Sequence, residues 1–266
     1  MQRRNFLTSS LAASALALSK SEPLAGKQGT SPAREYYELR TYHLQSGPQQ
    51  KLTNQYLSEA LIPGLNRLGI KTIGVFDLYL GPETPVLYVL IPSASLETLV
   101  TSELRLAEDD EYMKAGEAFL KAPAKEPAYV RVQSLLMIAF EGYPKLTVPP
   151  ATAQHGKRIF QLRTYESPSN ADHRRKVEMF NSGEFAIFEK AGFQNVFFGD
   201  TLIGARLPNL NYMLSIPDLA ELDPKWAAFG SDPDWKKLSG SPKFSYEPIV
   251  SNINNLILKP TSYSQI

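Results

Sequence analysis

Two arginines occupy equivalent places in a repeated hexapeptide, and their side chains are suited to binding an anion. Arg40 lies two residues from both Glu38 and Tyr42, and Arg163 lies two residues before Tyr165. Side chains two apart on a strand share one face, so each guanidinium would have polar neighbours beside it. Two roles remain open: an ion-pair and tyrosine network that closes the structure, or a carboxylate site, since a carboxylate matches the guanidinium fork.

Three further residues could contribute to chemistry. His43 stands at the end of the first hexapeptide's strand, and its repeat equivalent is Glu166. A His–carboxylate pair could bind a metal or shuttle protons, although two strand ends that face solvent are the simpler interpretation. Tyr112 and Trp235 also hold equivalent positions. They could line a small-molecule pocket between helix and sheet, or pack the core.

Several kinds of site are excluded by residue type and spacing. With no cysteine, the chain has no disulfide, thiolate zinc site, cysteine-ligated iron–sulfur cluster or cysteine nucleophile. The three histidines form no HxxxH or HxH pair, so a local zinc motif is absent. The phosphate-binding patterns GxxxxGK(S/T) and GxGxxG and the hydrolase pattern GxSxG are also absent. The sequence therefore identifies no metal site, no catalytic residue and no cofactor.

The composition is that of a globular protein with little net charge. The 266 residues are 43% hydrophobic and 21% charged, which excludes disorder of the whole chain. The 28 Lys and Arg against 27 Asp and Glu leave a formal charge of +1, which gives no long-range attraction for nucleic acid.

The N-terminus has the features of an export signal. Arg3 and Arg4 precede a short, mildly apolar stretch, and an Ala-x-Ala cleavage site ends at residue 17. The pattern resembles a twin-arginine signal, with a Sec signal as the alternative. We expect residues 1–17 to be a signal peptide and 18–34 a flexible leader, with the mature protein periplasmic or otherwise extracytoplasmic in a bacterium. The apolar stretch is too short to span a bilayer, so no transmembrane segment is expected in the mature chain.

An internal repeat sets the organisation of the chain. Residues 37–42 (YELRTY) recur as residues 160–165 (FQLRTY), which is an offset of 123. Residues 88–90 match residues 212–214 at an offset of 124, which predicts one inserted residue in the second hairpin. The two units and the linker between them are expected at residues 35–142, 157–260 and 143–156.

Each unit is predicted to form the same series of strands and helices. In the first, alternation predicts strands over 36–43, 72–80, 85–91 and 129–140, and helical spacing predicts helices over 49–68, 95–106 and 108–120. The second unit repeats them as strands over 158–165, 193–202, 211–216 and 249–258 and helices over 172–191, 218–229 and 234–238. Pro63 should break or kink the first helix. The order βαββαβ is the ferredoxin-like arrangement.

A four-stranded sheet with helices on one face leaves its other face uncovered, and burial needs a second layer there. We therefore predict an α+β protein in which the two ferredoxin-like units pack sheet to sheet as a pseudo-dimeric α/β barrel. If the apolar face of Leu39 and Leu162 meets the helices, the face of Arg40 and Arg163 points at the partner sheet inside the barrel.

The two hexapeptides, together with the segments WAAF (226–229) and DPDW (232–235), resemble the NIPSNAP family over roughly residues 35–259. The first unit has DDEY at 109–112 in place of DPDW. The resemblance implies the fold of the dimeric α/β-barrel superfamily, which includes haem-dependent and cofactor-free oxygenases. Mitochondrial relatives are linked to membrane-associated scaffolding. The family has no settled biochemical activity.

Two functions follow as hypotheses. The first is an exported protein that binds a small molecule or a protein partner, with further oligomerisation left open. The alternative is an oxidoreductase of monooxygenase type, cofactor-dependent or cofactor-free, which would use a cavity between helices and sheet. His173, whose repeat equivalent is Gln50, is the one histidine that could project into such a cavity in a single unit.

Overall fold

The computed structural model describes residues 33–154 and 156–266. The expected signal peptide and almost all of the expected leader, residues 1–32, lie outside the described residues.

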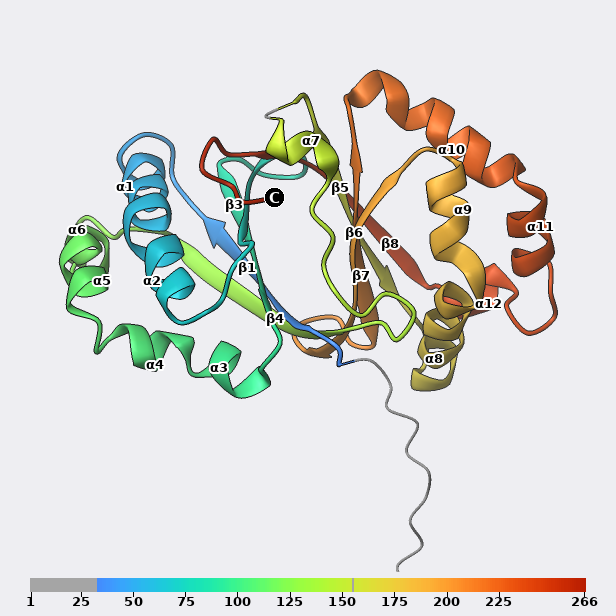
Figure 1. Cartoon of the computed structure of the whole chain (residues 1–266), viewed down its shortest axis with the longest axis horizontal. Helices are drawn as coiled ribbons and strands as arrows, with labels where there is room; N and C mark the ends of the chain where they lie inside the picture. Colours follow the sequence, from blue (N-terminus) through green and yellow to red (C-terminus); the bar gives the residue numbers. More distant parts are fainter. Residues whose placement is uncertain (1–32, 155) are drawn as a thin grey trace, which may run out of the picture. The chain divides into compact units, whose positions relative to one another are not determined.

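Both repeats show the predicted βαββαβ order (Figure 1). The first comprises β1 (Tyr36–His43), α1 (Pro48–Tyr56), η1 (Leu57–Leu61), α2 (Ile62–Arg67), β2 (Gly74–Leu80), β3 (Val86–Ser93), α3 (Leu96–Val100), α4 (Ser102–Leu106), α5 (Asp110–Ala115), α6 (Glu117–Leu120) and β4 (Arg131–Ala139). After α7 (Pro150–Ala153), the second comprises β5 (Ile159–Glu166), α8 (Asn170–Met179), η2 (Phe180–Glu184), α9 (Phe185–Lys190), β6 (Gln194–Ile203), β7 (Asn209–Ile216), η3 (Leu219–Glu221), α10 (Leu222–Ser231), α11 (Pro233–Ser239), α12 (Tyr246–Ile249) and β8 (Asn252–Pro260).

The long first helix of each repeat contains a π-helical segment at the same repeat position, η1 and η2. Pro63 follows η1 in the first turn of α2, where its missing N–H removes a helical hydrogen bond and a wider turn can absorb the change. The second repeat has Ala186 at that position, and η2 instead contains Gly183 at φ +133°. The irregularity therefore belongs to the repeat and not to the proline alone.

The eight strands form one closed antiparallel barrel in the order β1-β3-β2-β8-β5-β7-β6-β4. The repeats join through two seams, where β2 pairs with β8 and β4 pairs with β6. Pairing across the seams leaves neither sheet with an open edge. The predicted pseudo-dimeric barrel is confirmed, and its helices lie outside the strands on the side of their own repeat (Figure 1).

The strand register corrects the predicted insertion in the second hairpin. Leu39 pairs with Leu90 in the first repeat, and Leu162 pairs with Met213 in the second. Leu90 and Met213 are therefore equivalent at an offset of 123, the same as for the first strands. The similarity of residues 88–90 to 212–214 is a coincidence of apolar residues one position out of register.

The faces of the first strands are the reverse of the orientation in which Leu39 and Leu162 would meet the helices. Leu39 and Leu162 pack inside the barrel, in a cluster with Phe76 and Phe160. Arg40, on the opposite face of β1, instead bonds to Glu103 on α4. Both faces are buried here, so apolar content alone cannot tell which face meets the helices.

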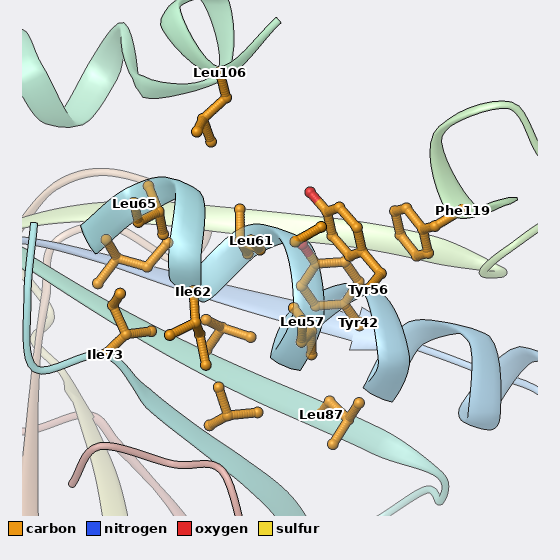
Figure 2. Packing of buried hydrophobic residues seen from close by; sticks show 14 of the residues in the cluster. Tyr42, Tyr56, Leu57, Leu61, Ile62, Leu65, Ile73, Leu87, Leu106 and Phe119 are labelled. Atoms are coloured by element: carbon orange, nitrogen blue, oxygen red, sulfur yellow. The ribbon is translucent and has the colours of Figure 1, made fainter. Parts of the chain in front are cut away.

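Each helix layer has its own apolar core against the outer face of the sheet. In the first repeat, Leu57, Leu61 and Leu65 from the long helix pack over β1 and β3, with Tyr56 and Phe119 beside them (Figure 2). The second layer is built largely from aromatic rings around Phe180 and Phe188. Three cores therefore stack across the molecule: helix layer, barrel interior and helix layer.

Candidate functional site

Arg40 is held by carboxylates of its own repeat. Its side chain is buried, with 6% of the residue exposed, and its Nε and Nη2 donate to the two oxygens of Glu38 at 2.7 and 2.9 Å. Nη1 donates to Glu103 on α4. Burial lowers the pKa of Arg40, but the hydrogen bond and charge of Glu38 outweigh it and raise the pKa well above its usual value. The guanidinium thus stays charged, with internal carboxylates in the place where an external anion would bind.

The tyrosines around Arg40 belong to the same layer. Tyr42 is buried beside Arg40, and burial raises its pKa to about 12. The Tyr56 and Tyr112 hydroxyls are 2.8 Å apart, and the Tyr56 ring stacks on Phe119 at 3.9 Å between centroids. Burial also raises the pKa of Tyr112. These phenols remain neutral at physiological pH, and all three belong to the apolar core between helices and sheet, where Figure 2 shows Tyr42 and Tyr56.

Arg163 has a different neighbour at the equivalent place. Its guanidinium carbon lies 4.2 Å from the centroid of the Trp226 ring and 5.2 Å from that of Tyr165. Trp226 donates its indole N–H to Gln161 at 2.9 Å. Trp226 is the repeat equivalent of Glu103, and Gln161 is that of Glu38. The same two positions therefore supply carboxylates in one repeat and an indole with an amide in the other.

A buried ion pair, which the sequence analysis missed, lies in the second helix layer. Lys176 Nζ lies 2.8 Å from Glu184 Oε2, and neither side chain is more than 2% exposed. Burial lowers the pKa of Lys176 and raises that of Glu184, and in each case the partner charge opposes the effect. Lys176 Nζ also lies 5.7 Å from the centroid of the Trp235 ring. The repeat could have indicated this pair, because Lys176 and Glu184 are two opposite charges at positions where the first repeat has the neutral residues Thr53 and Leu61.

His43 lies elsewhere, at one mouth of the barrel. β1 and β5 run in the same direction because four antiparallel steps separate them, so both strands end at this mouth. A cavity of about 450 Å³ opens there, and both repeats line it. Its polar lining consists of Thr41, His43, Glu83, Tyr88, Arg131, Gln133, Ser134, Thr164, Arg206, Asn209, Asn211 and Asn254.

His43 and Glu166 do not form the His–carboxylate pair that the sequence left open as an alternative to two solvent-facing strand ends. The first strands lie inside their own sheets and do not meet, so each strand end pairs with the hairpin of its own repeat. His43 Nδ1 lies 2.5 Å from Glu83 Oε1, and Nε2 lies 2.8 Å from Gln133 Oε1. In the second repeat, Glu166 lies 3.5 Å from Arg206. Positions 83 and 206 are repeat equivalents, so the two mouth pairs join equivalent positions. The glutamate is on the hairpin in the first repeat and at the strand end in the second.

Behind the mouth, amide and hydroxyl groups hold one another in place. Asn211 Nδ2 donates to Thr201 Oγ1 and to Asn209 Oδ1, both at 3.0 Å. Thr164 Oγ1 donates to Asn211 Oδ1 at 2.5 Å, and Asn209 Nδ2 donates to two carbonyls of the β6–β7 hairpin. These bonds use both side-chain N–H groups of Asn209 and Asn211 and the hydroxyl hydrogen of Thr164, so this network holds its groups in place and offers a ligand acceptor lone pairs only.

Comparison of sequences assigns both repeats to one family. The NIPSNAP family model matches residues 37–141 and again residues 160–265. The chain belongs to the NIPSNAP family. A search of curated protein sequences finds no match for this NIPSNAP protein.

Two solved structures share the fold of this chain, and a third is similar in sequence to part of it. A candidate monooxygenase from Fusobacterium nucleatum superposes with a TM-score of 0.57 at 7% identity, over 86% of this chain and 93% of its own. One from Lactobacillus acidophilus gives a TM-score of 0.56 at 7% identity, over 85% and 94%. An uncharacterised NIPSNAP-like domain protein from Burkholderia xenovorans is 23% identical over 41% of this chain and 90% of its own, with a TM-score of 0.37. At 7% identity, the likeness to the first two is a likeness of fold alone.

The residues expected to form a site thus divide among three places in this NIPSNAP protein. Glu38, Arg40, Tyr42 and Tyr112 share the first helix layer, Arg163, Tyr165 and Trp235 share the second, and His43 lies at the barrel mouth. His173 is buried, and its Nε2 lies 2.7 Å from Asp200 Oδ1.

Two negative findings apply to residues 33–154 and 156–266. Within these ranges, no three His, Asp or Glu side chains converge as a metal centre requires. No helix in the same part of the chain has the length and apolar character needed to cross a bilayer.

Proposed function

We propose that this NIPSNAP protein binds a small polar molecule in the mouth of its barrel. The observation that carries the proposal is the cavity of about 450 Å³ lined by hydroxyl and amide groups from both repeats, those of the second repeat held in a hydrogen-bond network. Its volume is within the range of small-molecule sites, and pre-positioned polar groups are what gives such sites their specificity. A barrel interior filled only for stability would be lined by apolar side chains, as the opposite half is around Phe76 and Phe160.

The charges at the mouth favour an uncharged or zwitterionic ligand. His43 with Glu83 and Arg206 with Glu166 form pairs within the protein, and Arg131 lies 4.0 Å from Glu83. The hydroxyls and carboxamides of the lining whose donors stay available to a ligand are those of Thr41, Tyr88, Gln133 and Asn254, and these groups both donate and accept hydrogen bonds. The ligand class that fits is therefore a compound rich in hydroxyl or amide groups.

Ligand-observed NMR with a panel of sugars, polyols, amides and amino acids tests the proposal. Asn254 lines the cavity, so Asn254→Trp fills it. Asn255, the next residue on β8, is exposed and lies outside the lining, so Asn255→Trp is the matched control. We expect members of one chemical class to bind the wild type and the control but not Asn254→Trp. Failure of every panel member to bind the wild type, or binding that Asn254→Trp leaves intact, would contradict the proposal.

The alternative function, an oxidoreductase with a cavity between helices and sheet, has less support from the packing. The helix layers are largely occupied by rings such as Tyr56 on Phe119, stacked at 3.9 Å, and Phe188 on Phe229, stacked at 4.5 Å. A cavity between α4 and the sheet, beside Arg40 and Glu103, has a volume of about 230 Å³, compared with about 450 Å³ at the barrel mouth. An absorbance spectrum of the protein purified from its native host checks this alternative, since a Soret band would identify haem and reverse the ranking.

We also propose that the protein is exported with its first 17 residues removed. The support is the pair Arg3-Arg4 and the Ala-x-Ala site that ends at residue 17. The double substitution Arg3→Lys/Arg4→Lys should trap the precursor in the cytoplasm if the twin-arginine route is used. Normal export of the double variant would point to the Sec route.

A further inference from the structure

A second cavity, of about 590 Å³, lies outside the barrel where the start of β5 and the segment after β7 face the ends of β2 and β8. Three of its lining residues are cationic, namely Lys157, Arg158 and Lys259, and one is acidic, Asp218. The cavity is separate from the barrel mouth, with which it shares no lining residue.

Arg158 is held by main-chain oxygens and by no side-chain carboxylate. Its Nη1 donates to the Gly156 carbonyl at 3.3 Å, and its Nη2 donates to the Ile266 main-chain oxygen at 3.0 Å. Its buried Nε–H has no hydrogen-bond partner among the described residues. Each terminal nitrogen keeps one further N–H, since a guanidinium has five donors. This half-buried cation is therefore oriented by main-chain oxygens, and burial lowers the pKa of Arg158.

The other charged groups of the lining are Lys157, Lys259 and Asp218. Lys259 places its Nζ 3.4 Å from the centroid of the Tyr79 ring. The Asp218 carboxylate already accepts hydrogen bonds from the main-chain N–H groups of Ala220 and Glu221, at 2.9 and 3.3 Å. The cavity thus presents more positive than negative charge.

Apolar groups form the rest of the wall. Ile159, Pro217, Leu219 and Pro260 line the cavity beside the Tyr79 ring, and Leu219 and Tyr79 are 38% and 41% exposed. Exposed apolar and aromatic groups next to a cluster of cations suit a ligand that has both an anionic group and an apolar body.

We propose that this cavity binds a small organic anion, a carboxylate or a phosphate ester, with its charged group at Arg158 and Lys259 and its apolar body against Tyr79 and Leu219. A guanidinium with two free N–H groups matches the paired oxygens of either anion. The inference does not depend on the function proposed for the barrel mouth.

Calorimetric titration of the full chain with phenyl phosphate, benzoate and inorganic phosphate tests the proposal. We expect phenyl phosphate or benzoate to bind at least about tenfold more tightly than inorganic phosphate, because the ring adds apolar contact. Arg158→Gln should weaken binding of the organic anion by at least about tenfold, since hydrogen bonds between charged groups are lost. Arg174→Gln removes the same charge from an exposed position on α8 and should leave binding unchanged.

Lys259→Gln provides a second variant at an exposed side chain, so a failure of Arg158→Gln to fold leaves the test intact. It should weaken binding in the same direction, whereas Asn254→Trp at the barrel mouth should not affect it. Which of phenyl phosphate and benzoate binds more tightly distinguishes a phosphate ester site from a carboxylate site. Equal binding by wild type and both cavity variants, or no binding of either organic anion by the wild type, would overturn the proposal.

Discussion

Replacing Arg40 by Met tests whether the first helix layer depends on its internal ion pair. The substitution keeps an unbranched side chain of similar reach and removes three charge-assisted hydrogen bonds, two to Glu38 and one to Glu103. Because the Glu38 side chain is only 16% exposed, its carboxylate would be left buried without its cation. Glu103 is 51% exposed on its side chain and can return to water.

The expected loss of stability follows from the difference in exposure between the Glu38 and Glu103 side chains. Breaking a buried pair by removing one partner costs about 3–5 kcal/mol, and with one stranded carboxylate instead of two we expect the lower end, about 3 kcal/mol. In a domain of this size, that corresponds to a fall in melting temperature of about 6–12 °C.

Urea unfolding followed by circular dichroism gives the free energy directly. A second variant, Arg40→Met with Glu38→Gln, removes the stranded charge as well and should recover part of the loss. A value for Arg40→Met within about 0.5 kcal/mol of wild type would refute the reasoning, because that is the range of substitutions at exposed positions.

Three further predictions concern stability. Lys176→Met should cost about 3–5 kcal/mol by leaving the buried Glu184 carboxylate without its cation, and Lys176→Met/Glu184→Leu should be more stable than the single variant in urea unfolding. Gly199→Ala would place a Cβ 2.9 Å from the Met137 side chain across the β4–β6 seam, and we expect a cost of about 1–3 kcal/mol in thermal unfolding. A main-chain hydrogen bond, followed by an arginine, lowers the pKa of Asp109 in the folded state. Its stabilisation is therefore present above about pH 4 and is lost as the pH falls through the lower folded value, so Asp109→Asn should make stability less sensitive to acid.

The fold could be predicted from the sequence because two independent features of the repeat pointed to it. The order βαββαβ came from local periodicity, and the open face of each sheet required the other copy. β1 was predicted with its observed bounds, 36–43. The register of the second hairpin was wrong because short apolar runs align almost equally well one residue out of step, and only the pairing of Leu90 and Met213 with the first strands resolves it.

The candidate site could be predicted only in part, because partners come from distant segments. Arg40 was correctly placed among polar neighbours, but the direction of its strand face depends on which of two buried faces meets the helices. The partner of His43, Glu83, was not predicted; the pair with Glu166 that was considered does not form, because equivalence in a repeat does not imply contact. With the offset of 123 applied to the hairpins, Glu83 and Arg206 are repeat equivalents, as His43 and Glu166 are. That equivalence could have suggested that each strand end contacts the hairpin of its own repeat.

The location of a bound molecule is the most direct test of the central claim, that the barrel mouth is a ligand site. A crystal structure with the strongest hit from the NMR panel should show density in the mouth, within hydrogen-bond distance of Thr164, Asn254 or His43. Density confined to a helix layer or to the outer surface, with the mouth empty at saturating concentration, would contradict it.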